Sequence, residues 1–250
     1  MSTLPRPVIA IIGASGGIGR PLAEHLAQQG YRLHLGARRA DPLQSLATEL
    51  GASAHALDAT DISAVDRFVA AAVEQHGQVD GLVNLAGSIL LKPAHQTRDE
   101  EWHTTLAQNL TSAFATVKAA GKHMRKQGGA VVLMSSGVAR AGFPNHEAIS
   151  AAKAGVIGLA QSAAASYASF NIRVNAVAPG LVQTPLAEPV TNTEAGMKAS
   201  LQMHALNRLG EPATVAAMIA WLLDPAHDWV TGQVFGVDGG LGTVRPKIRM

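Results

Sequence analysis

The strongest constraint on the fold is a regular alternation of short apolar runs with amphipathic segments along the whole chain. The first run, Val8–Ile12, is uninterrupted, which is typical of a strand buried on both faces. Further strands are expected at Leu33–Leu35, Ala54–Leu57, Val79–Leu85, Ala130–Met134, Ile172–Ala176 and Val234–Val237. Strands that alternate with helices build right-handed βαβ units. The sequence therefore predicts an α/β protein with a doubly wound, seven-stranded parallel sheet, helices on both faces and a single domain over residues 1–250.

The intervening segments carry helix start and stop signals. Asp41-Pro42 has the form of an N-cap followed by proline at the first helical position. Asp61 is placed to cap the next helix, which Gly77 ends, and Thr97-x-x-Glu100 has the form of a capping box that opens a long helix towards Lys126. Helices are thus predicted at Gly17–Gln29, after Asp41, at 62–76, at 98–126, at Glu147–Tyr167 and at Pro212–Leu223.

The composition excludes several classes of function. The net charge is only +2, with 15% charged residues and no block of like charges, which argues against nucleic-acid binding. Cysteine is absent, so disulfides and thiolate chemistry are impossible. No two histidines lie three or four residues apart, so we expect no metal site. We find no apolar run of the ~20 residues needed to span a bilayer and expect a cytoplasmic protein without membrane partners.

The loop after the first predicted strand is rich in glycine, from Gly13 to Gly19. Glycine here permits a sharp turn, close approach of backbone to a ligand, and tight packing of helix on strand. The helix N-terminus then directs free N–H groups at a phosphate. An ordinary tight turn between strand and helix is the alternative, because three glycines alone are weak evidence for a nucleotide site.

Together with later motifs, this spacing resembles the short-chain dehydrogenase/reductase family, closest to its 3-oxoacyl-(acyl-carrier-protein) reductase branch. The resemblance runs from Val8 to Gly240 and implies a Rossmann fold. The segments that carry it are Gly13–Gly19, Asn84–Gly87, Asn109 in the long helix, Ser136 and Lys153, Arg173–Thr184, Arg208–Pro212 and Val230–Gly240.

The resemblance implies a nicotinamide cofactor and a small carbonyl or alcohol substrate. Residues 1–130 would form the cofactor half, and residues 131–250 the active-site and substrate half. The implied cofactor-binding residues are Gly13, Ser15, Gly17, Ile18, Gly19, Arg38, Arg39, Asp58, Ala59, Asn84, Ala86, Gly87, Lys153, Pro179, Gly180, Val182 and Thr184. The implied catalytic residues are Asn109, Ser136 and Lys153. Relatives assemble through their long helices and last strand, which implies a homotetramer.

The second predicted strand indicates which nicotinamide cofactor would bind. An acidic residue at its end normally binds the ribose hydroxyls of NAD. Here that place is held by Ala37, and Arg38 and Arg39 follow. Guanidinium groups bind phosphate through paired hydrogen bonds, so we expect NADP(H). Solvated loop arginines are the alternative. Asp58 resembles the family's adenine-contacting aspartate, and its competing role is to cap the following helix.

One residue departs from the family pattern. The family form of the active site is Tyr-x-x-x-Lys, in which the tyrosine donates a proton to the substrate oxygen, whereas this chain has Ile149 four residues before Lys153. Isoleucine has no titratable group, and a general acid contributes about 10²- to 10⁴-fold in rate. The only tyrosines, Tyr31 and Tyr167, lie too far along the chain to substitute.

Two classes of function therefore stay open. His146, three residues before Ile149, is a candidate surrogate acid, because imidazole titrates near neutrality; the alternative is an ordinary loop residue. The first class is an NADP-dependent oxidoreductase with an altered proton path. The second is a nucleotide-binding protein without normal redox activity: a degenerate subunit, a regulator or a non-redox lyase.

Overall fold

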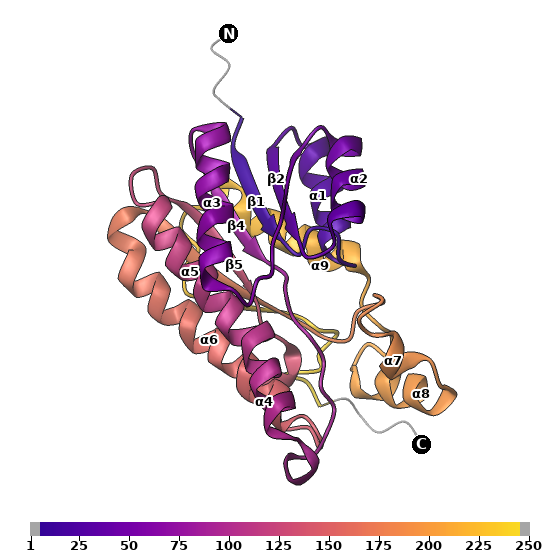
Figure 1. Ribbon diagram of the computed structural model, residues 1–250. Helices are drawn as coiled ribbons and strands as arrows, with labels where there is room; N and C mark the ends of the chain where they lie inside the picture. The colour runs from indigo at the N-terminus through magenta and orange to yellow at the C-terminus, as the bar shows by residue number, and fades with distance from the viewer. Residues whose placement is uncertain (1–5, 246–250) are drawn as a thin grey trace.

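The computed structural model describes residues 6–245, in which one β-sheet lies between two layers of helices (Figure 1). All seven strands are parallel, in the order β3-β2-β1-β4-β5-β6-β7, which confirms the predicted fold class. The strands are β1 (Val8–Ile12), β2 (Arg32–Ala37), β3 (Ser53–Ala56), β4 (Gly81–Asn84), β5 (Gly129–Met134), β6 (Ile172–Pro179) and β7 (Val234–Val237).

The strand order reverses at β1, which pairs with β2 on one side and β4 on the other. Every residue of β1 and of β4 is buried, as continuous apolar runs in a parallel sheet predict. A doubly wound sheet binds ligands beyond the carboxyl ends of its strands at such a reversal. The candidate site is therefore expected beyond Ile12 and Asn84.

Helices cover both faces of the sheet and enclose two apolar clusters. One cluster lies under α1, α2 and α9 and includes Leu22, Leu46 and Ile219, and the other lies under α3, α5 and α6 and includes Phe68 and Val156. The α-helices are α1 (Gly19–Gln28), α2 (Ala40–Leu50), α3 (Ile62–His76), α4 (Asp99–Leu106), α5 (Ser112–His123), α6 (Glu147–Tyr167), α7 (Glu188–Thr191), α8 (Glu194–Met203) and α9 (Pro212–Leu223). Short 3₁₀ turns are η1 (Ala94–Gln96), η3 (Gly137–Ala139), η4 (Ala168–Phe170) and η5 (Pro225–His227).

Several predicted boundaries are wrong by one to three residues. Helix α1 begins at Gly19 rather than Gly17, because Gly16 still belongs to the turn and donates its N–H to the Gly13 carbonyl at 3.0 Å. Strand β6 continues to Pro179 because its last residues pair with β7. Strand β4 is shorter than predicted and spans only Gly81–Asn84.

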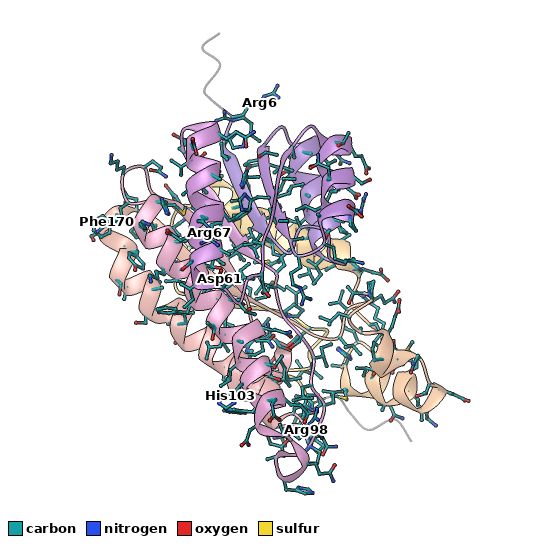
Figure 2. The ribbon with its side chains drawn as sticks, in the orientation of Figure 1. Arg6, Asp61, Arg67, Arg98, His103 and Phe170 are labelled. Carbon is teal, nitrogen blue, oxygen red and sulfur yellow. The ribbon has the colours of Figure 1, made fainter. Side chains whose placement is uncertain are left out.

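The two aspartates predicted to cap helices behave differently. Asp61 caps α3, since its carboxylate accepts the Ser63 N–H at 2.8 Å (Figure 2). The predicted cap at Asp41 is wrong: α2 begins at Ala40, and Asp41 lies in its first turn. Pro42 is tolerated inside the helix because the first four N–H groups of a helix have no intrahelical partner.

The predicted long helix from Thr97 to Lys126 is also divided. It begins one residue later than expected, with Arg98 at the N-cap, and the Glu101 carboxylate rather than Glu100 accepts the Arg98 N–H at 2.9 Å (Figure 2). A π-helical turn, η2 (Ala107–Thr111), then separates α4 from α5. Such turns are rare and are frequent at functional sites.

The segment between β6 and α9 forms two helices that the sequence pattern did not predict. Helices α7 and α8 project from the body of the molecule on the side where α4 also lies (Figure 1). The continuous helix Glu147–Phe170 is long and apolar enough to cross a membrane by length and composition alone, contrary to the sequence-based expectation. Its buried face, which includes Ala152 and Val156, packs in the protein core, and this makes it a core helix.

Candidate functional site

The glycine-rich turn lies beyond the carboxyl end of β1. Gly13 has a φ of 85° and donates its N–H to the Gly36 carbonyl at 2.8 Å, which holds the turn against β2. A Cβ at Gly19 would clash with the carbonyl oxygens of Gly13 and Ala14, so this helix start requires glycine. Ser15 is half-buried within the turn, and Ile18 is the N-cap residue of α1. The turn thus presents bare backbone at a helix N-terminus, where phosphate binds.

The loop after β6 closes against this turn. A Cβ at Gly17 would lie 2.5 Å from Thr184 Cγ2, so only glycine admits the contact. Val182 forms an isolated bridge with Gly210, and the Gly180 N–H bonds to the Val237 carbonyl at 3.2 Å. The predicted cofactor residues of β1 and β6 are therefore brought together across the sheet reversal.

At the end of β2, Ala37 is buried and both Arg38 and Arg39 are exposed. Asp58 does not cap the following helix; its carboxylate accepts the backbone N–H and the hydroxyl of Thr60, each at 2.9 Å. These bonds, and more weakly the charge of Arg38, hold the Asp58 pKa below its usual value. Ala59 beside it is buried. The edge thus offers two unburied guanidinium groups near one ionised carboxylate.

Asn84 fixes the loop after β4. Its side chain is 2% exposed, donates to the Thr116 hydroxyl at 3.0 Å and accepts the Ala86 N–H at 2.8 Å. The chain then turns at Gly87, where a Cβ would lie 2.9 Å from the Asn109 Oδ1 and 3.3 Å from the Lys153 Nζ. Gly87 therefore lies directly between two predicted catalytic residues and leaves no space for a side chain.

The π-helical turn η2 directs Asn109 into this site. Asn109 is 1% exposed, and its Nδ2 donates to the Ser88 hydroxyl at 3.0 Å and to the Thr105 carbonyl at 2.9 Å. Its Oδ1 accepts the Ser88 N–H at 3.2 Å. The sequence pattern missed Ser88, which binds Asn109 through both its backbone and its side chain.

Lys153 is the buried charge of the site. Its Nζ donates to the Met134 carbonyl at 2.9 Å, and the Ser135 hydroxyl donates to the Lys153 carbonyl at 2.9 Å. Burial lowers the Lys153 pKa to about 8. A lysine so placed can hold or release a proton near neutral pH.

Ser136 and Ile149 complete the cluster predicted from the sequence. The Ser136 hydroxyl donates to the Pro179 carbonyl at 3.4 Å, so it lies at the junction of β5 and β6. Ile149 is buried one helical turn before Lys153 in α6. The hydroxyl of Tyr167 lies beside Gly121 of α5, away from Lys153. No phenol reaches the site from the described part of the chain.

His146 lies apart from this cluster. It is the N-cap residue of α6, its ring is 5.7 Å from that of Phe143, and its Nδ1 donates to the Pro144 carbonyl at 2.7 Å. It lines a cavity of about 570 Å³ between α6 and the loop after β5. Asn109, Ser136 and Lys153 are not among the residues that line that cavity.

The sequence pattern missed His204. This residue follows α8, is 4% exposed and bonds to the Leu181 N–H in the loop after β6. His204 belongs to no recognisable sequence motif, so only the tertiary structure reveals its contact with Leu181.

The amino-acid sequence is similar to those of known reductases and dehydrogenases. Residues 13–242 match the family model described as enoyl-(acyl carrier protein) reductase. The chain is 35% identical to a 3-oxoacyl-(acyl-carrier-protein) reductase of Thermotoga maritima, over 94% of this chain and 97% of that protein. It is 38% identical to an L-rhamnose 1-dehydrogenase of Azotobacter vinelandii, over 93% and 95% of the two chains.

Solved structures agree with this chain in fold. A short-chain dehydrogenase/reductase from Mycobacterium ulcerans superposes with a TM-score of 0.91 at 30% identity, covering 98% of this chain and 92% of that chain. A variant of actinorhodin polyketide ketoreductase with NADPH gives 0.90 at 32% identity, covering 98% and 100%. With its parallel sheet, its glycine turn and its Asn109–Ser136–Lys153 set, the chain belongs to the short-chain dehydrogenase/reductase family.

Proposed function

We propose that this protein is an NADP(H)-dependent oxidoreductase that interconverts a small carbonyl compound and its alcohol through a non-standard proton path. The observation that carries this proposal is the pair of buried residues Asn109 and Lys153, which both lie against Gly87 beside the glycine turn. When bound, the cofactor supplies or accepts the hydride. Ser136 would orient the substrate oxygen, and Lys153 would hold a proton close to it.

The residues present fit a dinucleotide. Glycine at positions 13 and 17 lets the turn pack tightly against Leu85 and Thr184, and the N-terminus of α1 that the turn leads into favours the pyrophosphate. Arg38 and Arg39 would bind a 2′-phosphate, since Ala37 occupies the position of the acid that selects NAD. The NADPH-bound ketoreductase among the similar structures supports this choice.

Binding measurements test the cofactor proposal. We expect NADPH to bind more tightly than NADH by calorimetry, and Ala37→Asp combined with Arg38→Gln and Arg39→Gln to reverse the order. Arg125→Gln is the matched control, because it removes a guanidinium that lies over the Phe170 ring rather than near the site. Equal affinities in the unmodified protein would refute the choice of NADP(H).

The proton donor is the open part of the chemistry, because Ile149 has no proton to give. His146 is our candidate. If it donates, activity should depend on one ionisation near neutral pH, and His146→Ala should abolish turnover while leaving NADPH binding intact. An unchanged rate in that variant returns His146 to the role of an α6 N-cap residue.

A second candidate function is a nucleotide-binding protein without normal redox activity, which Ile149 favours. The two candidates differ in a single measurement, hydride transfer against a panel of ketones, aldehydes and alcohols. NADPH binding without any turnover would support the second candidate. We also propose a homotetramer, as in relatives, with small molecules as substrates.

A further inference from the structure

The His204 ring links two parts of the chain through uncharged partners. Its Nδ1 lies 2.7 Å from the Ser200 carbonyl oxygen of α8, and its Nε2 lies 3.0 Å from the Leu181 backbone nitrogen. A carbonyl oxygen only accepts, so Nδ1 must carry a proton. A backbone N–H only donates, so Nε2 must be free of one. Both bonds therefore exist only with a neutral, Nδ1-protonated imidazole.

The approach of the ring to the loop is close enough to require glycine. A Cβ at Gly180 would lie 2.5 Å from the His204 Nε2 and 2.9 Å from the Asp238 carbonyl oxygen. The ring thus lies against bare backbone. Gly180 and Leu181 begin the loop whose Thr184 meets Gly17 of the glycine turn. Leu181, which bonds to the ring, and Thr184, which meets the glycine turn, are thus three residues apart in the same loop.

On its other side, His204 ends the projecting α7–α8 segment. It follows the last residue of α8, Met203, and its N–H bonds to the Leu201 carbonyl. The chain then returns to the body, where the Leu206 N–H bonds to the Gly239 carbonyl at 3.0 Å. In Figure 1 the α7–α8 segment lies outside the layers of the fold. The His204 contact, meaning these two ring hydrogen bonds, is therefore a joint between segment and loop.

The charged groups on the elements next to His204 lie on four parts of the chain. Asp238, after β7, is buried and its carboxylate accepts the N–H groups of Gly240 and Gly242, each at 2.9 Å. Arg140 lies against the Gly236 backbone near that carboxylate. Lys198 and Glu194 lie on α8, and Arg208 follows the joint and bonds to the Leu209 carbonyl. Among the described residues none of these forms an ion pair with His204.

We propose that His204 is a positioning residue that joins the α7–α8 segment to the loop after β6 only while its imidazole is neutral, so that protonation of the ring breaks the bond to Leu181. A second ring proton would place Nε2–H against the Leu181 N–H, with two donors facing each other in a buried place. The bond from the Leu181 N–H would be lost, and the loop would be held only by its backbone bonds, which join Gly180 to Val237 and Gly210 to Leu181 and Gln183. The effect on cofactor binding rests on the proposed function, whereas the loss of the Leu181 bond does not.

Two measurements on the cofactor-free protein test the loss of this bond. Nitrogen NMR of the labelled ring at pH 7.5 should show His204 protonated at Nδ1 and not at Nε2. Amide hydrogen exchange, corrected for its intrinsic pH dependence, should show Leu181 losing about tenfold in protection once the ring titrates, the usual worth of one hydrogen bond. An Nε2-protonated ring, a ring that stays neutral to pH 5, or unchanged protection after titration would overturn the proposal.

Variants of His204 distinguish an effect of ring protonation from a purely structural role of the side chain. His204→Gln can accept from Leu181 and donate to Ser200 but cannot titrate, so we expect it to keep Leu181 protected at high pH and to abolish the acid step. His204→Leu should remove protection at all pH values. His25→Gln, which changes a ring bonded to Gln29 on the surface of α1, should leave the step unchanged. An acid step that persists in His204→Gln would assign it to another group.

NADPH affinity then reports on the coupling. We expect affinity to fall by about tenfold through the same titration in the unmodified protein and to vary less in His204→Gln. If the Leu181 bond is lost on acidification but no nucleotide binds at any pH, the proposed cofactor function fails while the His204 proposal stands. If NADPH binds with the same pH profile in both proteins, the coupling to the cofactor loop is refuted.

Discussion

Two residues, Lys153 and Ile149, determine the proton chemistry that we propose for this site. Lys153 is almost fully buried, and Ile149 stands one helical turn before it, where the family carries a phenol. Desolvation lowers the Lys153 pKa to about 8, so the lysine itself titrates within the working range of an enzyme. The remaining groups, Asn109 and Ser136, are held by defined hydrogen bonds.

Restoring the phenol tests whether the rest of the relay is intact. We expect Ile149→Tyr to create or raise reduction of activated ketones by about 10²-fold, within the usual worth of a general acid. The gain should require Lys153, whose charge lowers a phenol pKa. Steady-state NADPH oxidation by the unmodified protein, Ile149→Tyr and Ile149→Tyr/Lys153→Ala measures it.

One outcome would contradict the expectation that Ile149→Tyr raises activity. If the unmodified protein already turns over its substrate rapidly and the tyrosine lowers that rate, the chemistry is built around the isoleucine. A buried isoleucine pocket also resists a larger ring, so the folding of each variant should be checked by circular dichroism.

A second residue of note is His34 in β2, which is 2% exposed and lies 4.7 Å from the Phe68 ring. Burial, with smaller contributions from His76 and His55, lowers the His34 pKa from 6.5 to about 4. The unfolded chain then binds more protons than the folded chain between these values. The free energy of unfolding should therefore fall as pH drops from about 6.5 to about 4, by at most about 3 kcal/mol.

Urea unfolding at pH 7.5 and pH 4.5 measures this loss in the unmodified protein and in His34→Leu. The leucine variant should lose less free energy of unfolding at low pH, because it lacks the His34 imidazole. Ser53 keeps its bonds to the Leu33 carbonyl and to His76 in this variant. His25→Gln is the control and should retain the full loss. Equal pH dependence in all three proteins would assign the loss to other groups.

Among the elements, the helix starts show how local sequence and tertiary context compete. Asp61 and Asp41 have the same residue type near a helix start, yet only Asp61 accepts an N–H as a cap. The divided helix α4–η2–α5 is a second case, because the π turn that directs Asn109 inwards cannot be recognised from an unbroken helical pattern.

This difference between the two aspartates is measurable. We expect Asp61→Ala to lower the free energy of unfolding by about 1 kcal/mol, the usual cost of losing a cap, and Asp61→Ser to recover most of it. Asp41→Ala should cost less than half as much, since Asp41 acts only through the helix dipole. The Arg67–Asp61 ion pair is exposed and contributes little. Equal losses at both positions would contradict the assigned helix starts.

For the whole molecule, large apolar side chains remain on the surface. Trp102 and Phe114, on α4 and α5, are 38% and 48% exposed, and Trp229, before β7, is 96% exposed. The family resemblance predicts that the long helices and the last strand form the contacts between copies of the chain. Exposed apolar side chains of this size favour burial against another surface.

Light scattering should therefore give a mass of about four times 25.9 kDa at micromolar concentration. Phe114→Glu should shift the population to smaller species, because a charge would be buried in the interface. Phe170→Glu is the control, as Phe170 is comparably exposed but lies at the far end of α6 (Figure 2). A monomer in the unmodified protein would refute the tetramer.

The sequence by itself determined the layered parallel fold, the glycine turn and the Ile149–Lys153 spacing. These depend on local properties: apolar runs such as Val8–Ile12, glycines that alone fit a tight turn, and residues four apart on one helix. Only the tertiary structure decided that Gly87 separates Asn109 from Lys153, that His146 lies in a separate cavity, and that His204 joins α8 to Leu181. Each of these contacts unites residues far apart in the chain, and no local pattern encodes which distant backbone group a buried side chain will meet.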